Sequence, residues 1–395
     1  MKKIKICESL DTFYPNFDGP IQVVSNYAKE LNKISECQVI VPSSGDKSYK
    51  DVQPYEVFRV RSIRAFLGYR LAQPATDKKL KRYLREQKFD IIHLHSPFSM
   101  AKFLIRYGKK HNVPVILTLH TKFDQDIARV TKFKPFQKIA MRSIMKRFEQ
   151  ADFVWTVNNA TVQTLRDYGY KGEVGVVRNG TDMKYPEKAA ELRADVLAKH
   201  GLDPQKELIL IFIGRIVMYK NLGLICDALK IAKEKGLRFK MLVVGFGSDE
   251  EQFLEKAKAC GLSGEFIFAG KVLDREALSG YYLAADLFLF PSTFDTASLV
   301  PIEAAAHKVP TLLVTGSSTA EGTEDGVNAF WAAENAAAYA AKIMDIAADR
   351  GKLKAVGEAA YREIYRSWSM AAEEIYQKYD KITDEFGKKR FDKSL

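Results

Sequence analysis

The stretch Leu287–Glu303 reads LFLFPSTFDTASLVPIE. Its apolar start, Leu287–Phe290, stops at a proline, a polar loop with Asp295 follows, and a helix is expected to begin close to Glu303. Turns from a strand into a helix present backbone N–H groups to an anion. The carboxylates of Asp295 and Glu303, eight residues apart, can accept hydrogen bonds from hydroxyl groups of one ligand. The stretch therefore predicts a site for a phosphate with hydroxyls on either side, as in a nucleotide sugar.

Short apolar runs alternate with segments of helical periodicity on both sides of this stretch. Expected strands in the first half are 3–7, 37–41, 91–94, 113–119, 153–157 and 174–177, and expected helices are 21–31, 77–87, 99–111, 135–149 and 160–168. Expected strands in the second half are 208–213, 240–244, 265–268, 287–290 and 311–314, and expected helices are 186–200, 221–235, 249–260, 274–284 and 302–307, with a helical tail from 335. This succession predicts an α/β fold of doubly wound parallel sheets covered by helices on both faces.

The alternation pauses at Arg178–Asp182 and then restarts. A chain of 395 residues also fits two domains better than one core. We expect an N-terminal acceptor-side Rossmann-like domain at 1–180, a C-terminal nucleotide-sugar-binding domain at 181–370, and a C-terminal helix with a basic tail at 371–395 that crosses back to the first domain. Ligands of such sheets bind at the carboxyl ends of strands, which predicts a binding cleft between the two halves.

Composition narrows the range of partners. The formal net charge of +12, from 61 basic and 49 acidic residues, favours anionic partners such as nucleotide phosphates or an acidic membrane surface. No zinc-finger spacing, RNA-binding aromatic box or helix-turn-helix pattern accompanies the charge, which argues against nucleic acid. The four cysteines are widely spaced and are expected to be reduced core thiols. The apolar runs are only strand-sized, and no signal-peptide core precedes the first strand, so the sequence predicts a cytoplasmic protein.

Several loops at strand ends carry residues suited to phosphate. The loop Gly214–Asn221 contains Arg215, a planar fork of donors, and Lys220, a point charge, and the two suit a diphosphate. Gly245 ends the next strand and Gly19 precedes the first helix, and a glycine in such a place permits close backbone approach. A solvated loop and ordinary turn glycines are the alternative interpretations. The absence of a GxGxxG pattern argues against a nicotinamide cofactor, and no cofactor is expected.

Three histidines lie at strand ends. His93 and His95 share a face of one strand, but the sequence shows no third metal ligand nearby, so we expect hydrogen-bonding roles and no metal site. His120 follows an apolar run, precedes a polar loop and is placed at the mouth of the strand. It is either a satisfied core histidine or a ligand contact.

The segment 122–147 is basic and amphipathic. It holds eight lysines and arginines against two aspartates, with phenylalanines and isoleucines interleaved, several of them at helical spacing. Such a segment can lie on an anionic bilayer. The alternative is a surface helix that packs its apolar face on its own domain.

These motifs together resemble family 4 retaining glycosyltransferases of the GT-B fold, over nearly the whole chain. The resemblance is carried by Asp90–Pro97, Thr118–Thr121, Val177–Asp182, Gly214–Arg215 with Lys220–Asn221, and Pro291–Glu303 at the position of the family's E-x7-E motif. More narrowly, His95–Met100 with Leu119–Thr121 looks like the diacylglycerol glucosyltransferase-type branch. The resemblance implies two Rossmann-like domains that face a central cleft.

The resemblance also implies roles for particular residues. Arg215 and Lys220 would hold the donor diphosphate, Glu303 the ribose hydroxyls, and Asp295 the donor sugar. Further implied donor contacts come from Gly19, from the backbone of Val272 at the base, from backbone amides of Ala297, Ser298 and Leu299, and from His120 near the reacting side of the sugar. The family uses no metal, and retention is expected by front-face attack in which the departing phosphate accepts the acceptor's proton.

The chain departs from the family pattern in three places. Asp295 stands where the family has glutamate, and Ala297–Ser298 stands where Phe–Gly is typical. The first loop holds Asp18–Gly19–Pro20 instead of two successive glycines. The departures at Asp295 and at Ala297–Ser298 leave the identity of the donor sugar open.

The expected function is transfer of a hexose, glucose in first place, from a UDP-sugar to a membrane lipid such as diacylglycerol, on the cytoplasmic side and with peripheral membrane attachment. A lipid-linked or soluble saccharide of a surface polymer is a second candidate acceptor. Two different functions also fit the motifs: a sugar-nucleotide 2-epimerase, which needs no acceptor, and a non-catalytic sugar-nucleotide-binding protein. The presence of Arg215, Lys220 and Glu303 argues against the non-catalytic function.

Overall fold

The computed structural model describes residues 3–16, 18–46, 48–65 and 70–392, with side chains as far as residue 387. The chain forms two compact units. Unit 1 comprises Met1–Asn179 together with Trp368–Leu395, and unit 2 comprises Gly180–Ser367. The divisions fall at 179/180 and 367/368, where the sequence suggested 180/181 and 370/371.

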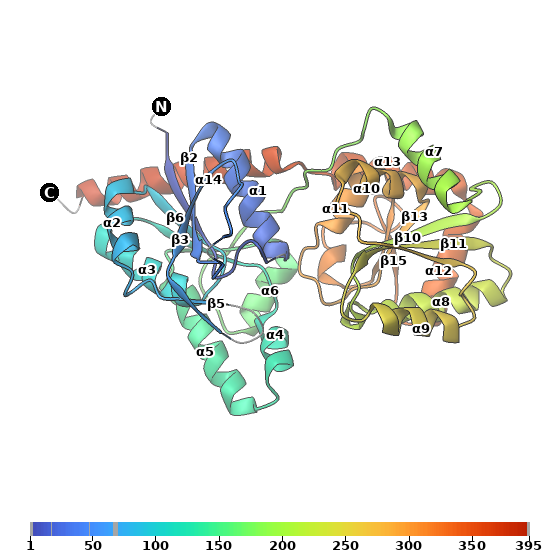
Figure 1. Ribbon diagram of the computed structural model, residues 1–395, viewed down its shortest axis with the longest axis horizontal. Coiled ribbons are helices and arrows are strands. Elements are labelled where there is room, and N and C mark those ends of the chain that lie inside the picture. The colour runs from blue at the N-terminus through green and yellow to red at the C-terminus, as the bar shows by residue number, and fades with distance from the viewer. Residues whose placement is uncertain (1–2, 17, 47, 66–69, 393–395) are drawn as a thin grey trace. The chain divides into compact units, whose positions relative to one another are not determined.

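Unit 1 is built around a parallel sheet with strand order β3-β2-β1-β6-β7-β8-β9 (Figure 1). Its strands are β1 (Lys5–Ser9), β2 (Glu36–Pro42), β3 (Glu56–Val60), β6 (Ile91–Leu94), β7 (Val115–Leu119), β8 (Phe153–Thr156) and β9 (Gly175–Val176), and β4 (Ser62–Arg64) pairs with β5 (Arg70–Ala72) as a separate antiparallel ribbon. The helices of this unit are α1 (Gly19–Ile34), α2 (Lys78–Gln87), α3 (Ser99–His111), α4 (Phe123–Val130), α5 (Lys134–Gln150), α6 (Asn159–Asp167) and α14 (Trp368–Asp392).

Unit 2 has a parallel sheet with strand order β12-β11-β10-β13-β14-β15. Its strands are β10 (Leu208–Arg215), β11 (Phe239–Phe246), β12 (Phe266–Gly270), β13 (Leu287–Phe290), β14 (Thr311–Val314) and β15 (Phe330–Ala332). Its helices are α7 (Ala189–His200), α8 (Leu222–Glu234), α9 (Glu250–Ala259), α10 (Arg275–Ala284), α11 (Val300–Ala306), α12 (Ala336–Ala348) and α13 (Arg350–Glu363), with 3₁₀ turns at Met218–Lys220 and Ser318–Ala320.

The continuous apolar run of β10 follows from burial on both faces of the sheet. Leu208, Leu210 and Phe212 pack into one core cluster together with α8, α9 and α12. The residues between them pack on the opposite face, with α7, α10 and α11. Because side chains alternate along a strand, a strand covered on both faces must be apolar at every position. Polar side chains are therefore expected at the ends of the strands.

Both sheets reverse their strand order at one place. In unit 1 the chain moves outward from β1 through β2 and β3, and then returns to the other side of β1 with β6. In unit 2 it moves outward from β10 and returns with β13. The loops that leave neighbouring strands at such a point diverge to opposite faces, and a crevice opens at the carboxyl ends where ligands of this fold class bind.

Polar side chains cap several helices. Asp77 begins α2 by accepting hydrogen bonds from the backbone N–H groups of Lys79 and Leu80. Asn158, Asp274 and Asn335 do the same for α6, α10 and α12. These short polar side chains satisfy donors that have no partner inside the helix, which is why the helices begin where they do.

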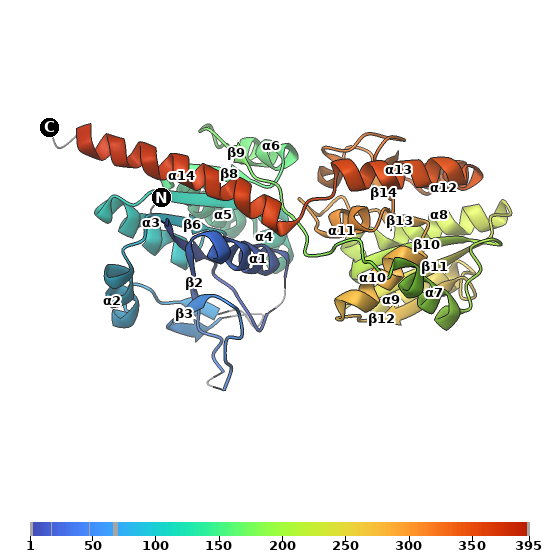
Figure 2. The same cartoon turned by 90° about the horizontal axis from the view of Figure 1, so that it is seen from above.

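The helix α14 belongs to unit 1, although the chain has passed through all of unit 2 before reaching it. It lies beside α1 in both views (Figures 1 and 2), and the rings of Tyr27 and Trp368 meet edge to face at 5.2 Å. Within the part of the chain that the structure describes, neither this helix nor any other is long and apolar enough to cross a membrane.

The structure corrects the expected loop after His120. The helix α4 begins at Phe123, and the ring of Phe123 is buried in the core of unit 1. The polar residues Asp124 and Asp126 that suggested a loop lie in the first turn, where acidic side chains favour the helix end. The strands β3 and β15 were also missed, because Glu56–Val60 carries two charged side chains and Phe330–Ala332 has only three residues.

We predict that Gly247→Ala destabilises unit 2. A Cβ atom at Gly247 would lie 1.9 Å from the carbonyl oxygen of Ile216, so the backbone would have to move. Overpacking of this kind costs about 1–3 kcal/mol, which corresponds to a loss of several degrees in the thermal unfolding midpoint. Gly264→Ala is the control, because a Cβ there meets no atom within 4 Å. Equal midpoints for the two variants would contradict this account of the loop.

Candidate active site

The loops that leave β10 and β13 meet at the reversal point of unit 2. Lys220 ends the 3₁₀ turn after β10, and Asp295 lies in the loop after β13. The Lys220 Nζ atom is 3.1 Å from Asp295 Oδ1, and the two side chains are 11% and 19% exposed. The ammonium also lies 5.7 Å from the centre of the Phe290 ring. A cation and an anion, both largely buried, thus stand together where this fold class binds its ligands.

The second carboxylate oxygen of Asp295 has an unmet hydrogen-bonding capacity. Oδ2 is buried, and it has no hydrogen-bond partner among the residues that the structure describes. A buried acceptor without a partner costs free energy that a donor group could recover. A ligand hydroxyl would supply that donor.

Arg215 lies at the end of β10, exposed to solvent, and within the described residues no ion pair or side-chain hydrogen bond holds its guanidinium. Gly245 ends the neighbouring strand and pairs with Gly214. A Cβ atom at Gly245 would lie 1.9 Å from the Gly214 carbonyl oxygen, and its φ is +145°. Gly245 is therefore required by the packing of two strand ends, whether or not a ligand also approaches it.

Glu303 is buried at the start of α11 and belongs to a network of its own. Its Oε1 atom lies 3.4 Å from Nη1 of Arg275, and its Oε2 atom accepts a hydrogen bond of 2.9 Å from the Tyr282 hydroxyl. Arg275 also makes a two-point contact with Asp182. Sequence reasoning missed Arg275, which shows no signal beyond its place next to the helix cap Asp274. No contact joins Glu303 to Lys220 or Asp295 among the described residues.

The Glu303 network sets the charge of its members. Burial raises the pKa of Glu303, and the Arg275 guanidinium opposes that rise without cancelling it. Burial lowers the pKa of Arg275, but Glu303 and Asp182 outweigh it and hold the pKa above its usual value. Burial also raises the pKa of Tyr282, with Glu303 adding to the effect. Tyr282 thus stays protonated and donates to Glu303.

The remaining residues of unit 2 that are predicted to contact the donor are three loop residues and Val272. Ala297, Ser298 and Leu299 are partly exposed in the loop before α11. The helix has only seven residues, so the case for an anion here rests on Arg215 and Lys220 rather than on the helix end. Val272 follows β12, and its partly buried side chain packs against the core.

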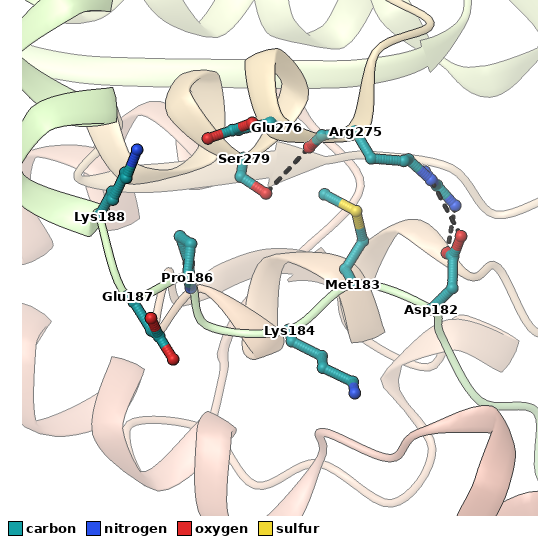
Figure 3. Close-up of a pocket in the computed structure, with 9 residues that line it drawn as sticks. All are labelled: Asp182, Met183, Lys184, Pro186, Glu187, Lys188, Arg275, Glu276 and Ser279. Carbon is teal, nitrogen blue, oxygen red and sulfur yellow. Dashed lines mark hydrogen bonds and ion pairs between the residues drawn. The ribbon is translucent and has the colours of Figure 1, made fainter.

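A pocket of about 350 Å³ lies elsewhere in unit 2 (Figure 3). It is lined by Asp182, Met183, Lys184, Pro186, Glu187, Lys188, Arg275, Glu276 and Ser279. Arg275 reaches across to Asp182 at one end of it, as Figure 3 shows. The lining includes none of Arg215, Lys220, Asp295 and Glu303, so this hollow is not the site that the sequence predicts.

In unit 1, Gly19 is the first residue of α1, and the preceding Asp18 caps the helix through the Ile21 N–H. A Cβ atom at Gly19 would meet nothing within 4 Å, so no contact inside this unit requires a glycine. His120 directly follows β7 and is partly exposed. Its Nε2 atom lies 2.8 Å from Nδ1 of His95, and the two rings stack. Burial, followed by the neighbouring histidines, lowers the pKa of His120.

Behind His120 lies a buried cluster that the sequence did not predict. Glu8 of β1 stands opposite His93 in the sheet register, and its Oε2 atom lies 2.5 Å from His95 Nε2. Its Oε1 atom accepts a 2.8 Å hydrogen bond from the Tyr379 hydroxyl of α14. The carboxylate of Glu8, one residue before the end of β1, was the available signal. The sequence did not predict that Glu8 lies beside His93 and His95.

Glu8, His93 and His95 could in principle ligate a metal ion, since their ligand atoms all lie within 4.8 Å of one another. The geometry favours hydrogen bonding instead. Ligands at about 2.0–2.2 Å from a tetrahedral ion lie roughly 3.3–3.5 Å apart, whereas Glu8 and His95 are 2.5 Å apart. That separation is typical of a charge-assisted hydrogen bond. His93 is likewise engaged, by Tyr379 at 2.6 Å and by Thr118 at 2.6 Å.

The helices α4 and α5 form a hairpin that extends beyond the other elements of unit 1 (Figure 1). The last two turns of α5 pack into the core through Ile144, Met145 and Phe148. At the hairpin tip, Phe133 and Ile139 are 67% and 64% exposed. Val130 and Phe136 are also exposed, and so are the basic side chains Lys132, Lys134 and Lys138. The apolar face thus packs on the domain at one end and faces solvent at the other.

Two family models match the chain. The model described as glycosyltransferase family 4 matches residues 18–185, and the model described as glycosyl transferases group 1 matches residues 195–363. The first match covers most of unit 1 and the second covers most of unit 2. The chain belongs to glycosyltransferase family 4.

Curated relatives of this glycosyltransferase include two α-monoglucosyldiacylglycerol synthases. The one from Streptococcus pneumoniae is 25% identical over 76% of this chain and 69% of its own length. The one from Acholeplasma laidlawii is 25% identical over 82% of this chain and 84% of its own length. A GDP-mannose-dependent phosphatidylinositol dimannoside mannosyltransferase from Mycobacterium tuberculosis is 24% identical over 64% of each chain.

Solved structures establish the fold of this glycosyltransferase as GT-B. The HepE protein of Anabaena, solved with UDP and glucose, superposes with a TM-score of 0.73 at 16% identity, over 95% of this chain and 99% of that one. A sucrose-phosphate synthase from Thermosynechococcus elongatus gives a TM-score of 0.74 at 17% identity, over 96% and 100%. The expected fold of two Rossmann-like domains is confirmed.

We predict that acid weakens the folded state through His93. Burial lowers the pKa of His93 to about 4, well below its value of about 6.5 in the unfolded chain. The unfolded state therefore binds more protons as the pH falls from 6.5 toward 4, and stability falls with it, by up to about 3 kcal/mol. Thermal unfolding midpoints between pH 7.5 and 5 measure the effect.

The variant His111→Gln is the control for that titration, because His111 is exposed and should leave the pH dependence unchanged. A fall in the midpoint on acidification that is as large in His93→Gln as in the wild-type protein would show that His93 is not the group responsible.

Proposed function

We propose that this glycosyltransferase transfers glucose from UDP-glucose, with retention of configuration, to a membrane lipid such as diacylglycerol. The observation that carries the donor half of the proposal is the Lys220–Asp295 pair at the reversal point of the unit 2 sheet, 3.1 Å apart. The pair offers a cation for the diphosphate and, through the unpartnered Asp295 Oδ2, an acceptor for a sugar hydroxyl. A nucleotide sugar needs both within one ligand's length.

The proposed reaction is the one that the family resemblance implies. The bond between the sugar's anomeric carbon and the diphosphate oxygen breaks, and the acceptor oxygen bonds to that carbon on the same face. The departing phosphate oxygen takes the acceptor's proton. Arg215 and Lys220 offset the charge that develops on the diphosphate, so the step runs without a metal ion. Lys220 must then share its charge between Asp295 and the diphosphate.

The remaining roles keep the assignment that the family resemblance implies. Glu303 accepts hydrogen bonds from the ribose hydroxyls, which requires the carboxylate to exchange part of its contact with Arg275, at 3.4 Å the longer of its two contacts. The amides of Ala297, Ser298 and Leu299 and the backbone of Val272 contact the donor. Gly19 approaches the phosphate, and His120 contacts the transferred sugar.

Relatives support the choice of donor and acceptor. One structural neighbour, HepE of Anabaena, was solved both with UDP-glucose and with UDP, and two curated relatives are named for monoglucosyldiacylglycerol synthesis. Because another relative is named for the use of GDP-mannose, the base and the sugar have to be compared directly in an assay.

The acceptor half of the proposal rests on the α4–α5 hairpin. Its tip exposes large apolar side chains between lysines, and nothing in unit 1 packs on them among the described residues. Apolar rings can enter the headgroup region while lysines contact anionic lipid. We propose that this tip holds the enzyme at an anionic membrane surface, where a lipid acceptor would be reached.

A saccharide acceptor is the second candidate. A relative 26% identical over 78% of this chain is encoded in the cps region of Klebsiella pneumoniae, and its name states no substrate. Supplying either diacylglycerol vesicles or soluble saccharides separates the two candidates.

We predict that label from radioactive UDP-glucose moves into the organic phase only when diacylglycerol vesicles are present. Lys220→Ala should lower kcat/KM about a hundredfold, since it removes a charge that acts on the leaving diphosphate. Asp295→Asn should keep UDP affinity and lose transfer, because an amide oxygen at that position is a weaker acceptor.

Lys235→Ala is the control for Lys220→Ala, since Lys235 is an exposed lysine after α8 in the same unit. Transfer that is undiminished in Lys220→Ala would remove the assigned donor site. Wild-type transfer from GDP-mannose but not from UDP-glucose would replace the proposed donor.

We predict that replacing Lys132, Lys134 and Lys138 by glutamine weakens binding to anionic vesicles. Each basic residue near such a surface contributes about 1 kcal/mol, so the loss of three corresponds to roughly a hundredfold in affinity. Sedimentation with phosphatidylglycerol vesicles measures it. The matched control replaces Lys78, Lys79 and Lys81 of α2, three exposed lysines of the same unit. Equal binding by both triple variants would refute the membrane role of the hairpin.

A further inference from the structure

The buried cluster of unit 1 lies at the place where that sheet reverses its strand order. Glu8 is on β1, and His95 directly follows β6, the strand on the other side of the reversal. The His95 N–H donates to the Ser9 carbonyl at 2.8 Å, which holds the two strand ends together. Both side chains are at most 3% exposed. A carboxylate here must be paired, because an isolated charge in such surroundings is very costly.

The hydrogen bonds around Glu8 have determinable directions. An ionised carboxylate only accepts, so His95 Nε2 and the Tyr379 hydroxyl both donate to it. With its proton given to Glu8, the Tyr379 oxygen accepts from His93 Nδ1. His93 Nε2 then accepts from the Thr118 hydroxyl. Each polar atom has one role, and all of the roles follow from the charge on Glu8.

The positive charge that balances Glu8 has one well-placed carrier. His95 Nε2 is 2.5 Å from the carboxylate, whereas His93 Nδ1 is 3.5 Å away and is engaged by Tyr379. The thiols of Cys7 and Cys37 lie near Glu8, and burial raises their pKa values, so they carry no charge. The Tyr379 hydroxyl stays protonated because burial raises its pKa as well. His95 is therefore the ring best placed to pair with the charge of Glu8.

The proton positions of His95 decide those of the next ring, because His95 Nδ1 and His120 Nε2 lie 2.8 Å apart and one of them must donate. Where His95 Nδ1 carries the proton, His120 Nε2 accepts. The single proton of a neutral His120 is then on Nδ1, which makes Nδ1 a hydrogen-bond donor. Without Glu8, a neutral His95 would donate from Nε2 to the residue at position 8 and accept at Nδ1, and the His120 proton would move to Nε2.

We propose that Glu8 and His95 are positioning residues that hold the ring of His120 in place and keep its proton on Nδ1. The contact of His120 with the transferred sugar rests on the proposed function above, whereas the hydrogen-bond chain from Glu8 to His120 does not. This hydrogen-bond chain selects the tautomer of His120, the partly exposed histidine of the cluster, and makes its Nδ1 atom a donor.

Nitrogen NMR of the ¹⁵N-histidine-labelled full chain at pH 7 tests the proposal directly. In the wild-type protein we expect His120 with its proton on Nδ1 and His95 with both nitrogens protonated, the signals being assigned by His95→Asn and His120→Asn. In Glu8→Gln, which keeps the size of the side chain and removes its charge, we expect His120 to carry its proton on Nε2. A wild-type His120 protonated on Nε2 would overturn the proposal, and that measurement needs no variant to fold.

Tyr379→Phe is the matched variant inside the cluster. It removes a hydrogen bond from Glu8 but leaves the contact between Glu8 and His95, so the His120 tautomer should not change. A shift of the His120 tautomer in Tyr379→Phe equal to that in Glu8→Gln would mean that any disturbance of the cluster moves the proton, and would refute a chain through His95.

Kinetics supply the second readout. Glu8→Gln should lower kcat about tenfold or more with the UDP dissociation constant and the donor KM unchanged, and Glu36→Gln, an exposed glutamate on β2, should change neither. Loss of UDP affinity in step with kcat would indicate a general structural role and would count against positioning. If wild-type enzyme transfers no sugar, the proposed function fails, while the NMR measurement still decides the state of His120.

Discussion

A parallel sheet with helices on both faces leaves little room for polar chemistry along its strands. Every position of β10 from Leu208 to Phe212 is buried on one face or the other, so charged groups gather where the strands end. The reversal of strand order then decides which ends matter, because loops diverge only there. Lys220 with Asp295 in unit 2, and Glu8 with His95 in unit 1, both occupy that position. One topological constraint thus places the main polar pairs of both units.

The two pairs differ in what they leave unsatisfied. The oxygens of Glu8 are both engaged by protein groups, and His95 links the cluster to His120. Asp295 has one oxygen in an ion pair and one without a partner among the described residues. A closed network fixes geometry, whereas an open one waits for a ligand. The first arrangement suits support of a neighbouring residue, and the second suits binding.

Sequence patterns located the elements better than they located the contacts. The strand Leu287–Phe290 and the acidic side chains that follow it could be predicted, because apolar runs and breakers are local signals. The helix α4 was mistaken for a loop, since two aspartates in its first turn resemble a polar connection. The pairing of Glu303 with Arg275 and of Glu8 with two histidines could not be predicted. Those contacts join residues 28 and more than 80 positions apart, and their register is set by the sheet.

The position of Tyr379 has a consequence for biosynthesis. Its hydroxyl binds Glu8 across 371 residues of sequence, and it comes from a helix that the ribosome adds after the whole of unit 2. While the chain is being made, the first sheet can assemble from local βαβ units, but one oxygen of its buried carboxylate lacks its donor. The N-terminal unit therefore cannot reach its final polar core in the order in which it is synthesised. Its maturation is tied to the arrival of α14, so that a nascent chain stopped within unit 2 would carry an N-terminal unit with an incompletely satisfied buried charge.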